Sequence, residues 1–307
     1  MLKKYFILVV FAILPYIISG QTVGLVLSGG GSKGLAHIGV IKALEESGIP
    51  IDYIGGTSMG AIVGSCYAMG MTTDEISEII RSDEFNYWMS GILEEEYKYY
   101  FKAEDPGPDI FNVGIDLQDS VPKTRIPLSV IPNYLMDFAF MEIYSRASAA
   151  AGYDFDSLFV PFLCNAADIS NSKEVLFRSG DLSQAVRASM TVPLYFRPIV
   201  MDGSIMYDGG IYNNFPVQHV MDEFDPDVII GSKAAQGNTP PDEFDIMAQI
   251  ENLVMKPASY EIDSTRGILL DMNFKKQSLL AFDKLDEFVE VGYKITMEKM
   301  DSIKMLV

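Results

Sequence analysis

Histidine, cysteine and tryptophan are scarce in this chain of 307 residues, which holds two, two and one of them respectively. The shortage of histidine leaves His37 and His219 as the only candidates for an imidazole base. Cys66 and Cys164 each fall inside an apolar stretch, which predicts two buried thiols. A disulfide between them is the alternative, since an exported protein would permit one.

Basic residues are also few. Lysine and arginine total 23 against 42 acidic residues, which gives a formal net charge of −19 at pH 7. A surface with this charge repels nucleic acid and other phosphate-rich partners. We therefore expect no nucleic-acid partner, whereas the charge says little about the fold.

Long apolar runs are absent beyond the first residues of the chain. A shorter run opens it, from about Tyr5 to Ile18, and lies between two lysines and the small residues Ser19 and Gly20, an order typical of a cleaved secretory signal peptide. An uncleaved anchor is the alternative, but the run is shorter than the ~20 residues that a membrane-spanning helix needs. The sequence thus predicts a signal peptide over residues 1–20 and export to the periplasm, the outer membrane or the medium.

The residues after this segment alternate between strand and helix patterns. Apolar residues 23–27 predict a buried strand, and helical spacing follows until a glycine and a proline end the helix. A second strand over 52–56 leads directly into a helix of small residues that Gly70 ends, and Thr72 with Glu75 forms a candidate capping box for the next helix. This order predicts an α/β fold with a mainly parallel sheet.

The pattern continues after an interruption. Residues 83–160 lose the periodicity and are rich in aromatic residues, so we interpret them as an insertion or cap on the sheet. Further on, the sequence predicts strands over 160–169 and 173–180, a helix capped by Asp181, a hairpin turning at Asp202 and Gly203, a short helix from Pro216 and a strand over 227–232. We expect one domain over 21–307, with a core of about 22–235 and a helical extension of about 245–307.

The segment GTSMG, residues 56–60, places a serine where the second strand turns into a helix. Gly56 and Gly60 leave room for a sharp turn in which flanking side chains would collide. Ser58 then stands at a helix N-terminus, where unpaired amides and the helix dipole stabilise negative charge. This placement favours Ser58 as a nucleophile, with Thr57 and Met59 as supporting residues of the turn.

A serine nucleophile needs a base, and the chain offers carboxylates besides its two histidines. Asp202 is explained by the hairpin turn that it forms with Gly203. Asp208 is followed by Gly209 and Gly210 at the end of the second hairpin strand, where no turn is needed to explain it. The two glycines leave the carboxylate accessible, so the pattern favours Asp208 as the base. A solvated loop acid is the alternative.

Three consecutive glycines lie between the first strand and the first helix, in the segment SGGGSKG. A loop of Gly29, Gly30 and Gly31 can aim two or three amides at one point, as the oxyanion of acyl transfer requires. The neighbouring Lys33 either faces negative charge or a phosphate headgroup at this loop, or it is an exposed lysine held by a salt bridge.

Other interpretations fit parts of this pattern. The glycine loop also matches the GxGxxG of a dinucleotide site, but the acid Asp52 begins the second strand instead of ending it. An α/β-hydrolase would use Ser58, Asp208 and His219 in this chain order, but that fold builds several strands ahead of its nucleophile. A non-catalytic exported passenger or binding domain of a larger outer-membrane protein is the remaining alternative.

Four motifs, taken together and in this order, resemble the patatin-like phospholipase family: GGGSKG at 29–34, GTSMG at 56–60, ASMTVPLYFRP at 188–198 and DGG at 208–210. The resemblance covers roughly residues 22–235. It implies a three-layer fold with a mainly parallel central sheet flanked by helices, and a catalytic dyad of Ser58 and Asp208. The oxyanion site that it implies is the loop formed by Gly29, Gly30, Gly31, Ser32, Lys33 and Gly34.

The function that the resemblance implies is hydrolysis of lipid carboxylic esters, of the phospholipase A or lysophospholipase type. This chemistry needs no metal and no cofactor, and the expected partner is a phospholipid or another lipid ester, met in transient contact with a membrane surface. Family members from Gram-negative bacteria often continue into a transport-associated domain and an outer-membrane barrel, so those are the further domains to expect if the chain is a fragment.

Two expectations about the site follow. Because a free aspartate has a pKa of about 3.9, burial has to raise the pKa of Asp208 for it to act as a base. Aromatic and methionine-rich residues at 85–101 and 134–144 either line a pocket for the acyl chain or belong to the core.

Overall fold

The computed structural model describes residues 20–90, 114–116, 123–125, 134–235, 249, 256, 258–274 and 278–307. The predicted signal peptide lies outside these residues except for Gly20, and so do nearly half of the predicted insertion and a smaller part of the segment 245–307. Among the helices of the described part, none has both the length and the apolar character needed to span a membrane.

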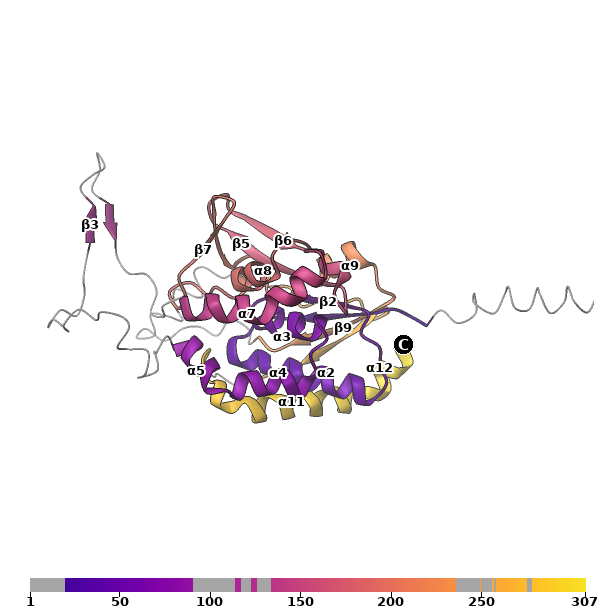
Figure 1. Ribbon diagram of the computed structural model, residues 1–307. Helices are drawn as coiled ribbons and strands as arrows, with labels where there is room; N and C mark the ends of the chain where they lie inside the picture. The colour runs from indigo at the N-terminus through magenta and orange to yellow at the C-terminus, as the bar shows by residue number, and fades with distance from the viewer. Residues whose placement is uncertain are drawn as a thin grey trace, which may run out of the picture.

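A central sheet of eight strands organises the described residues (Figure 1). Its strands are β1 (Val23–Leu27), β2 (Tyr53–Gly56), β5 (Phe162–Asp168), β6 (Lys173–Phe177), β7 (Ile199–Met201), β8 (Ser204–Asp208), β9 (Val228–Lys233) and β10 (Gly267–Asp271). The pairs β10–β9, β9–β1, β1–β2 and β2–β5 are parallel, whereas β5 pairs antiparallel with β6 and β8, and β8 with β7. Strands β3 (Gly114–Asp116) and β4 (Lys123–Arg125) form a separate antiparallel pair.

Helices pack on both faces of this sheet. They are α2 (Ala36–Glu46), α3 (Met59–Ala68), α4 (Thr73–Arg81), α5 (Asp83–Ser90), α7 (Tyr134–Ala150), α8 (Leu182–Ser189), α9 (Val217–Phe224), α11 (Leu285–Glu298) and α12 (Met300–Leu306), with short 3₁₀ turns η1 (Gly31–Leu35), η2 (Phe155–Ser157), η3 (Gly209–Ile211) and η4 (Phe282–Lys284).

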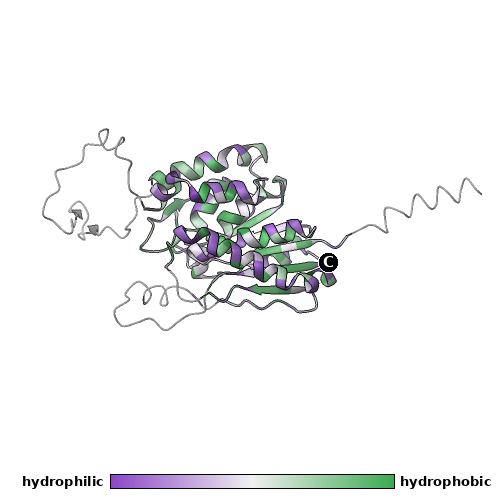
Figure 2. Ribbon diagram, turned by 90° about the horizontal axis from the view of Figure 1, so that it is seen from below, coloured by the Kyte–Doolittle hydropathy of each residue, from purple (hydrophilic) through white to green (hydrophobic). Residues whose placement is uncertain are grey.

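Alternation along β1 separates two cores. Leu25 and Leu27 belong to the large core, which most of the helices share, whereas Val26 points to the other face and packs with Val220 of α9. Figure 2 shows hydrophobic strands between helices that are hydrophobic on one side and hydrophilic on the other. The predicted three-layer α/β fold with a mainly parallel sheet is confirmed.

Most predicted elements lie where the sequence pattern placed them, because their start and stop signals are local. The capping box of α4 is present: the Thr72 hydroxyl accepts from the Glu75 N–H at 3.2 Å, and the Glu75 carboxylate accepts from the Thr72 N–H at 2.8 Å. The hairpin of β7 and β8 turns at Asp202 and Gly203, both with positive φ.

The expectation for the C-terminal segment needs a correction. Helices α11 and α12 confirm its helical end, but Gly267–Asp271 form β10, which extends the sheet by pairing with β9. The run GILLD is short and continuously apolar in its middle, as a strand buried in a parallel sheet requires. The segment is therefore part of the sheet layer as well as the helical layer.

Helices α2 and α11 approach so closely that their backbones touch at glycines. A Cβ added at Gly39 of α2 would lie 1.9 Å from the carbonyl oxygen of Val289, and one at Gly292 of α11 would lie 2.0 Å from that of Ala36. Figure 1 shows the two helices side by side below the sheet. This contact joins the first helix of the domain to its C-terminal part.

We expect the substitution Gly39→Ala to lower the free energy of unfolding by about 1–3 kcal/mol, because the added methyl meets backbone that cannot rotate away. Gly64→Ala is the matched control, since this glycine is also buried in a helix but its nearest neighbours are side-chain atoms, of which Cγ2 of Ile54 is nearest at 2.9 Å. Urea unfolding of both variants measures the difference. Equal midpoints for the two variants would contradict the tight contact.

Candidate active site

The turn from β2 into α3 has the sharp geometry that the sequence predicts. Ser58 precedes α3 with backbone angles of φ 56° and ψ −121°, a region that residues other than glycine rarely occupy. A Cβ at Gly56 would lie 2.4 Å from the carbonyl oxygen of Gly60, and one at Gly60 would lie 2.3 Å from that of Leu27. Both glycines are therefore required for the turn to close against the end of β1.

A buried polar network lies behind Ser58 and holds the turn. The Thr57 hydroxyl donates to Oδ1 of Asn165 at 2.7 Å. The side-chain amide of Asn165 donates in turn to the carbonyl oxygen of Asn213 and to the carboxylate of Glu174, each at 2.8 Å. Asn165 is fully buried in β5, so every one of these bonds replaces a lost contact with water. The network ties the serine turn to the central strand.

Asp208 ends β8 and is 1% exposed. Its N–H donates to the carbonyl oxygen of Thr191, and its Oδ1 accepts from the N–H of Gly210, both at 2.8 Å. Two residues before Thr191, the hydroxyl of Ser189 accepts from the N–H of Ser58 at 3.0 Å. The residues that end and follow α8 thus contact both predicted site residues.

The two glycines after Asp208 have a different consequence from the predicted one. The prediction that they leave the carboxylate accessible is wrong, because Asp208 is buried. Instead they let backbone pack around it: a Cβ at Gly209 would lie 2.5 Å from the carbonyl oxygen of Asn165, and Gly210 supplies the amide that binds the carboxylate.

The register of three strands brings the ends of β2 and β8 together. Gly56 pairs with Cys164 of β5, and Asp208 pairs with Ala166. Strand β6 pairs with both of these β5 residues from the opposite side, so β2 and β8 share one edge of β5. They run toward each other and end two β5 positions apart, or ~7 Å along the strand. Ser58 lies two residues after the end of β2, so the serine turn and Asp208 lie on the two sides of this gap.

The glycine loop passes directly against the serine turn. A Cβ at Gly29 would lie 3.1 Å from the Cβ of Ser58, and one at Gly34 would lie 2.5 Å from the side chain of Met59. Lys33, in the same loop, is only 7% exposed, so the alternative of an exposed lysine is wrong. The predicted loop and the predicted nucleophile are therefore neighbours in space.

Some amides of this region are already bonded and others are not. The N–H of Gly29 donates to the carbonyl oxygen of Asn214 at 3.1 Å, and that of Ser32 donates to the carbonyl oxygen of Leu279 at 2.8 Å. These two amides are therefore occupied. Three backbone N–H groups around Ser58 have no acceptor within the described ranges, those of Gly30, Gly31 and Met59.

His37 supports the glycine loop from inside the protein. Its ring is fully buried, with Nε2 2.9 Å from the carbonyl oxygen of Ser28 and Nδ1 2.7 Å from the hydroxyl of Ser232. Because a carbonyl only accepts, Nε2 carries the proton and donates, while Nδ1 accepts from Ser232. Burial lowers the pKa of His37 to about 4, so the ring is neutral at pH 7 and holds the end of β1 in place.

His219 lies on α9 and binds a different acid from the one that a triad would require. Its Nε2 is 2.9 Å from Oε1 of Glu174, and this hydrogen bond raises the pKa of His219 above its usual value. In the Ser58–Asp208–His219 alternative, the acid that orients the imidazole is Asp208. In the structure, the acid that is hydrogen-bonded to His219 is Glu174.

An apolar pocket opens at Ser58, and we call it the site pocket. Its empty space measures about 360 Å³, including the part open to solvent. Methionine, aromatic and aliphatic side chains make up most of its wall. Its lining residues are Gly31, Ser58, Met59, Ile62, Met89, Met190, Val192, Tyr195, Phe196, Leu279, Leu280 and Phe282.

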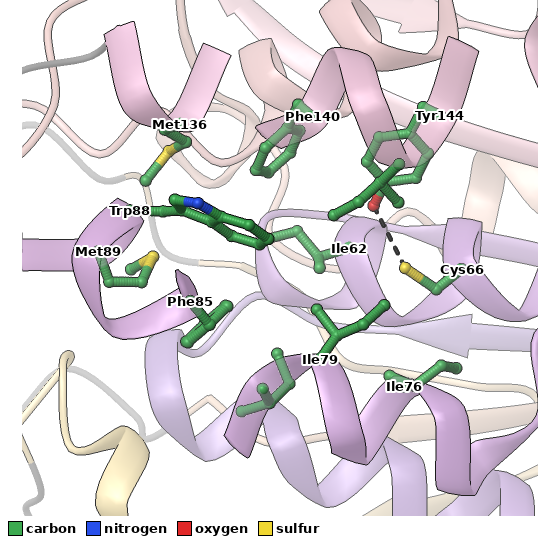
Figure 3. Close-up of a pocket in the computed structure, with 12 residues that line it drawn as sticks. Ile62, Cys66, Ile76, Ile79, Phe85, Trp88, Met89, Met136, Phe140 and Tyr144 are labelled. Atoms are coloured by element: carbon green, nitrogen blue, oxygen red, sulfur yellow. Dashed lines mark hydrogen bonds between the residues drawn. The ribbon is translucent and has the colours of Figure 1, made fainter. Parts of the chain in front are cut away.

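A second space, the distal pocket, lies between α3, α4, α5 and α7 (Figure 3). Its empty space measures about 480 Å³, again including open solvent. Of the aromatic and methionine residues expected to line a pocket or to belong to the core, about half do both, whereas Phe138 and Met141 are exposed. Residues 91–101 lie outside the described ranges. The lining residues are Ile62, Cys66, Ile76, Ile79, Ile80, Phe85, Trp88, Met89, Met136, Phe140, Ile143 and Tyr144.

Both cysteines are free and buried, which confirms the prediction of two buried thiols. Burial raises the pKa of Cys66 to about 11 and also raises the pKa of Cys164. Both thiols are therefore protonated and unreactive at neutral pH.

Sequence reasoning missed several residues that hold the site. Asn165 carries a recognisable signal, since an amide in the middle of an apolar strand needs buried partners. Ser189 and Thr191 fall inside the motif at 188–198, but nothing in the sequence assigns them bonds to Ser58 and Asp208. Leu279 carries no signal, because its contact with the glycine loop spans more than 240 residues of the chain.

The comparison with protein families decides the membership. The model described as "Patatin-like phospholipase" matches residues 25–221. The chain belongs to this family. The resemblance predicted from the four motifs is confirmed, and membership supports the prediction of a lipid acyl hydrolase.

Curated relatives include enzymes named lysophospholipase NTE1. The protein from Pyricularia oryzae is 29% identical over 314 residues, which cover 93% of this chain and 19% of that protein. The protein from Aspergillus fumigatus is 33% identical over 201 residues, which cover 66% of this chain and 11% of that protein. The chain thus spans about a fifth or less of the length of these relatives.

Among solved structures, VipD from Legionella pneumophila is similar with a TM-score of 0.51 and 16% sequence identity. The match covers 92% of this chain and 67% of the VipD chain. At this identity the likeness concerns the fold alone, and it agrees with the three-layer arrangement described above.

The burial of neutral His37 predicts a pH dependence of stability. Because its pKa is about 4 in the folded protein and about 6.5 when exposed, the unfolded chain binds more protons between these values. Stability is therefore lost as pH falls from about 6.5 to 4, by roughly 3 kcal/mol from this group. Urea unfolding of wild type and His37→Gln across this range measures it. The variant should show a shallower pH slope, and identical slopes would rule out a neutral His37.

Proposed function

We propose that this chain is a lipid acyl hydrolase of the phospholipase A or lysophospholipase type, with Ser58 as the nucleophile and Asp208 as its base. The observation that carries the proposal is the meeting of β2 and β8 on one edge of β5. At this meeting, a serine in a strained turn lines an apolar pocket, and a buried aspartate ends the opposing strand.

The first half of the proposed reaction acylates the serine. Asp208 accepts the hydroxyl proton of Ser58 as Oγ forms a bond to the ester carbonyl carbon, and the carbonyl electron pair moves onto its oxygen. When the tetrahedral intermediate collapses, the carbon–oxygen bond to the alcohol breaks, and the proton on Asp208 passes to the leaving oxygen. An acyl-serine and a free alcohol or lysolipid result.

The second half releases the fatty acid. A water molecule attacks the acyl carbon and gives its proton to Asp208, which forms a second tetrahedral intermediate. Collapse breaks the bond to Oγ of Ser58, and the proton returns from Asp208 to that oxygen. The carboxylic acid is released and the free enzyme is regenerated. Over the whole cycle the protein neither gains nor loses a proton.

The oxyanion of both intermediates needs donors that are not already used. Of the six loop residues predicted for this role, Gly29 and Ser32 have bonded amides. We assign the role to the amides of Gly30 and Gly31 together with that of Met59, the residue after the nucleophile. Each such donor typically contributes about 3 kcal/mol to the transition state.

The support around Asp208 suits a base. The amide of Gly210 orients one carboxylate oxygen, and burial keeps bulk water away from the proton transfer. The backbone bond from its N–H to Thr191 fixes the strand end on which it sits.

The substrate class follows from the pocket and the charge. A wall of methionine, aromatic and aliphatic side chains suits a fatty acyl chain and offers little to a polar acyl group. The net charge of −19 opposes contact with anionic lipid surfaces, so we propose zwitterionic or neutral lipids as the substrates.

Export through residues 1–20 stays a prediction.

Three substitutions separate the proposed dyad from its alternatives. Ser58→Ala should abolish hydrolysis of p-nitrophenyl butyrate and of phosphatidylcholine, and Asp208→Asn should lower kcat by roughly 10²–10⁴-fold, because proton transfer is lost. His219→Ala should keep most of the activity, since its partner is Glu174. Loss of activity in the His219 variant would instead favour the triad.

A fluorophosphonate probe separates an enzyme from a non-catalytic domain. The wild type should be labelled at Ser58, and Ser58→Ala should not be labelled. A folded wild-type protein that never labels would favour the binding-domain alternative, while full activity of Asp208→Asn would contradict the dyad.

The network behind Ser58 should matter for rate more than for binding. Thr57→Val keeps the size of the side chain but leaves Oδ1 of Asn165 without its donor, so we expect kcat to fall ~10-fold with KM little changed. Thr57→Ser keeps the hydroxyl and should restore most of the rate. Steady-state kinetics on one soluble ester measure both, and equal rates for the Val and Ser variants would contradict the role of this hydrogen bond.

A further inference from the structure

We propose that the distal pocket binds the acyl chain of the substrate. The cluster of Tyr144, Cys66 and Ile76 at the far end of this pocket limits the chain length that the enzyme accepts. This inference rests on the proposed role of Ser58. It goes beyond that role because it assigns selectivity to residues that are distant from the serine turn.

The two pockets are neighbours along α3. Ile62 and Met89 line both of them. Ile62 lies one helical turn beyond Ser58, and its N–H donates to the carbonyl oxygen of Ser58 at 3.1 Å. An acyl chain whose carbonyl carbon is at Ser58 reaches the distal pocket by passing between the side chains of Ile62 and Met89, which form the boundary of the two spaces.

The direction and length of this path follow from helix geometry. Ser58, Ile62 and Cys66 recur every four residues, so they lie on one face of α3. With a rise of 1.5 Å per residue, Cys66 lies about 12 Å beyond Ser58 along the helix. A saturated chain with bonds of ~1.5 Å advances about 1.25 Å per carbon, so roughly ten carbons reach the level of Cys66.

The side walls of this path are apolar throughout. Figure 3 shows Met136, Phe140 and Tyr144 of α7 on one side, with Ile79 and Ile76 of α4 facing them. Each methylene buried against such a wall favours binding by about fourfold. The affinity for the acyl chain therefore rises with every additional carbon until the chain reaches the end of the pocket.

The far end is closed by side chains that bond one another. The Ser65 hydroxyl donates to the Tyr144 hydroxyl at 3.1 Å, and the Cys66 sulfur lies 3.4 Å from the same oxygen. Tyr144 is 1% exposed, so its ring is a fixed part of the wall. Burial raises the pKa of Tyr144 and of Cys66, and both groups face the pocket uncharged. Longer chains have to displace this packed cluster.

The test is a chain-length profile on the full protein. kcat/KM for p-nitrophenyl esters of about four to sixteen carbons should rise about fourfold per carbon and stop rising near ten carbons for the wild type. Tyr144→Leu removes the ring that closes the pocket and should move this limit outward by about two to four carbons, whereas Ile76→Phe fills the end and should move it inward by a similar number.

Phe155→Leu is the matched control for Tyr144→Leu. Phe155 is equally buried but packs against Phe162, away from both pockets. It should lower stability without moving the limit. Limits that stay at the wild-type length in Tyr144→Leu and Ile76→Phe would overturn the proposal, as would an equal shift in Phe155→Leu.

A binding measurement keeps this result separate from the proposed catalysis. In Ser58→Ala, saturated fatty acids should raise the melting temperature in proportion to chain length up to the same limit, and Tyr144→Leu in this background should extend it. If Ser58 of the wild type is never labelled by a fluorophosphonate, the proposed function fails while the binding series still tests the pocket. A binding series without a length limit overturns the inference.

Discussion

Two strands that end head-on against one edge of β5 are the constraint on which the rest of the site depends. β2 and β8 share that edge and run in opposite directions, so any residue added to either end would meet the other. The chain avoids this by turning away sharply at both places, into α3 after Ser58 and into η3 after Asp208. Each turn carries one polar residue, Ser58 or Asp208. The two strand ends therefore bring these residues to the same region of the sheet although they are far apart in the sequence.

The packing around this meeting leaves little freedom. Gly56, Gly60 and Gly209 have backbone where a side chain would stand, and Asn165 bonds to the serine turn from the middle strand. The end of α8 adds a bond to each turn. Because these contacts come from four separate parts of the chain, the positive φ of Ser58 is maintained by the whole fold instead of by the turn alone.

The sequence predicted those features that depend on neighbouring residues. Glycines around Ser58 report a sharp turn, the capping box reports the start of α4, and Asp202 with Gly203 reports a hairpin, because each requirement acts within a few residues. The parallel sheet followed from the order of the elements. These are the parts of the fold and of the site that a sequence can specify locally.

What the sequence did not predict depends on distant contacts. β10 was missed because a five-residue apolar run becomes a strand only when β9 is beside it. The burial of Asp208 and of Lys33 depends on how segments more than a hundred residues apart pack, and the same holds for the bond between Ser189 and Ser58. Motifs identified which residues belong to the site, whereas packing determined how exposed each of them is.

The contact between the glycine loop and residues 278–282 bears on how the domain is delimited. Ser32 donates its amide to Leu279 and its hydroxyl to Ser278, and Phe282 lines the site pocket. The stretch matched by the family model ends at residue 221, well before these residues. A boundary drawn at the last motif would therefore cut through the wall of the site, and the smallest self-sufficient unit has to include the C-terminal helix that α2 holds.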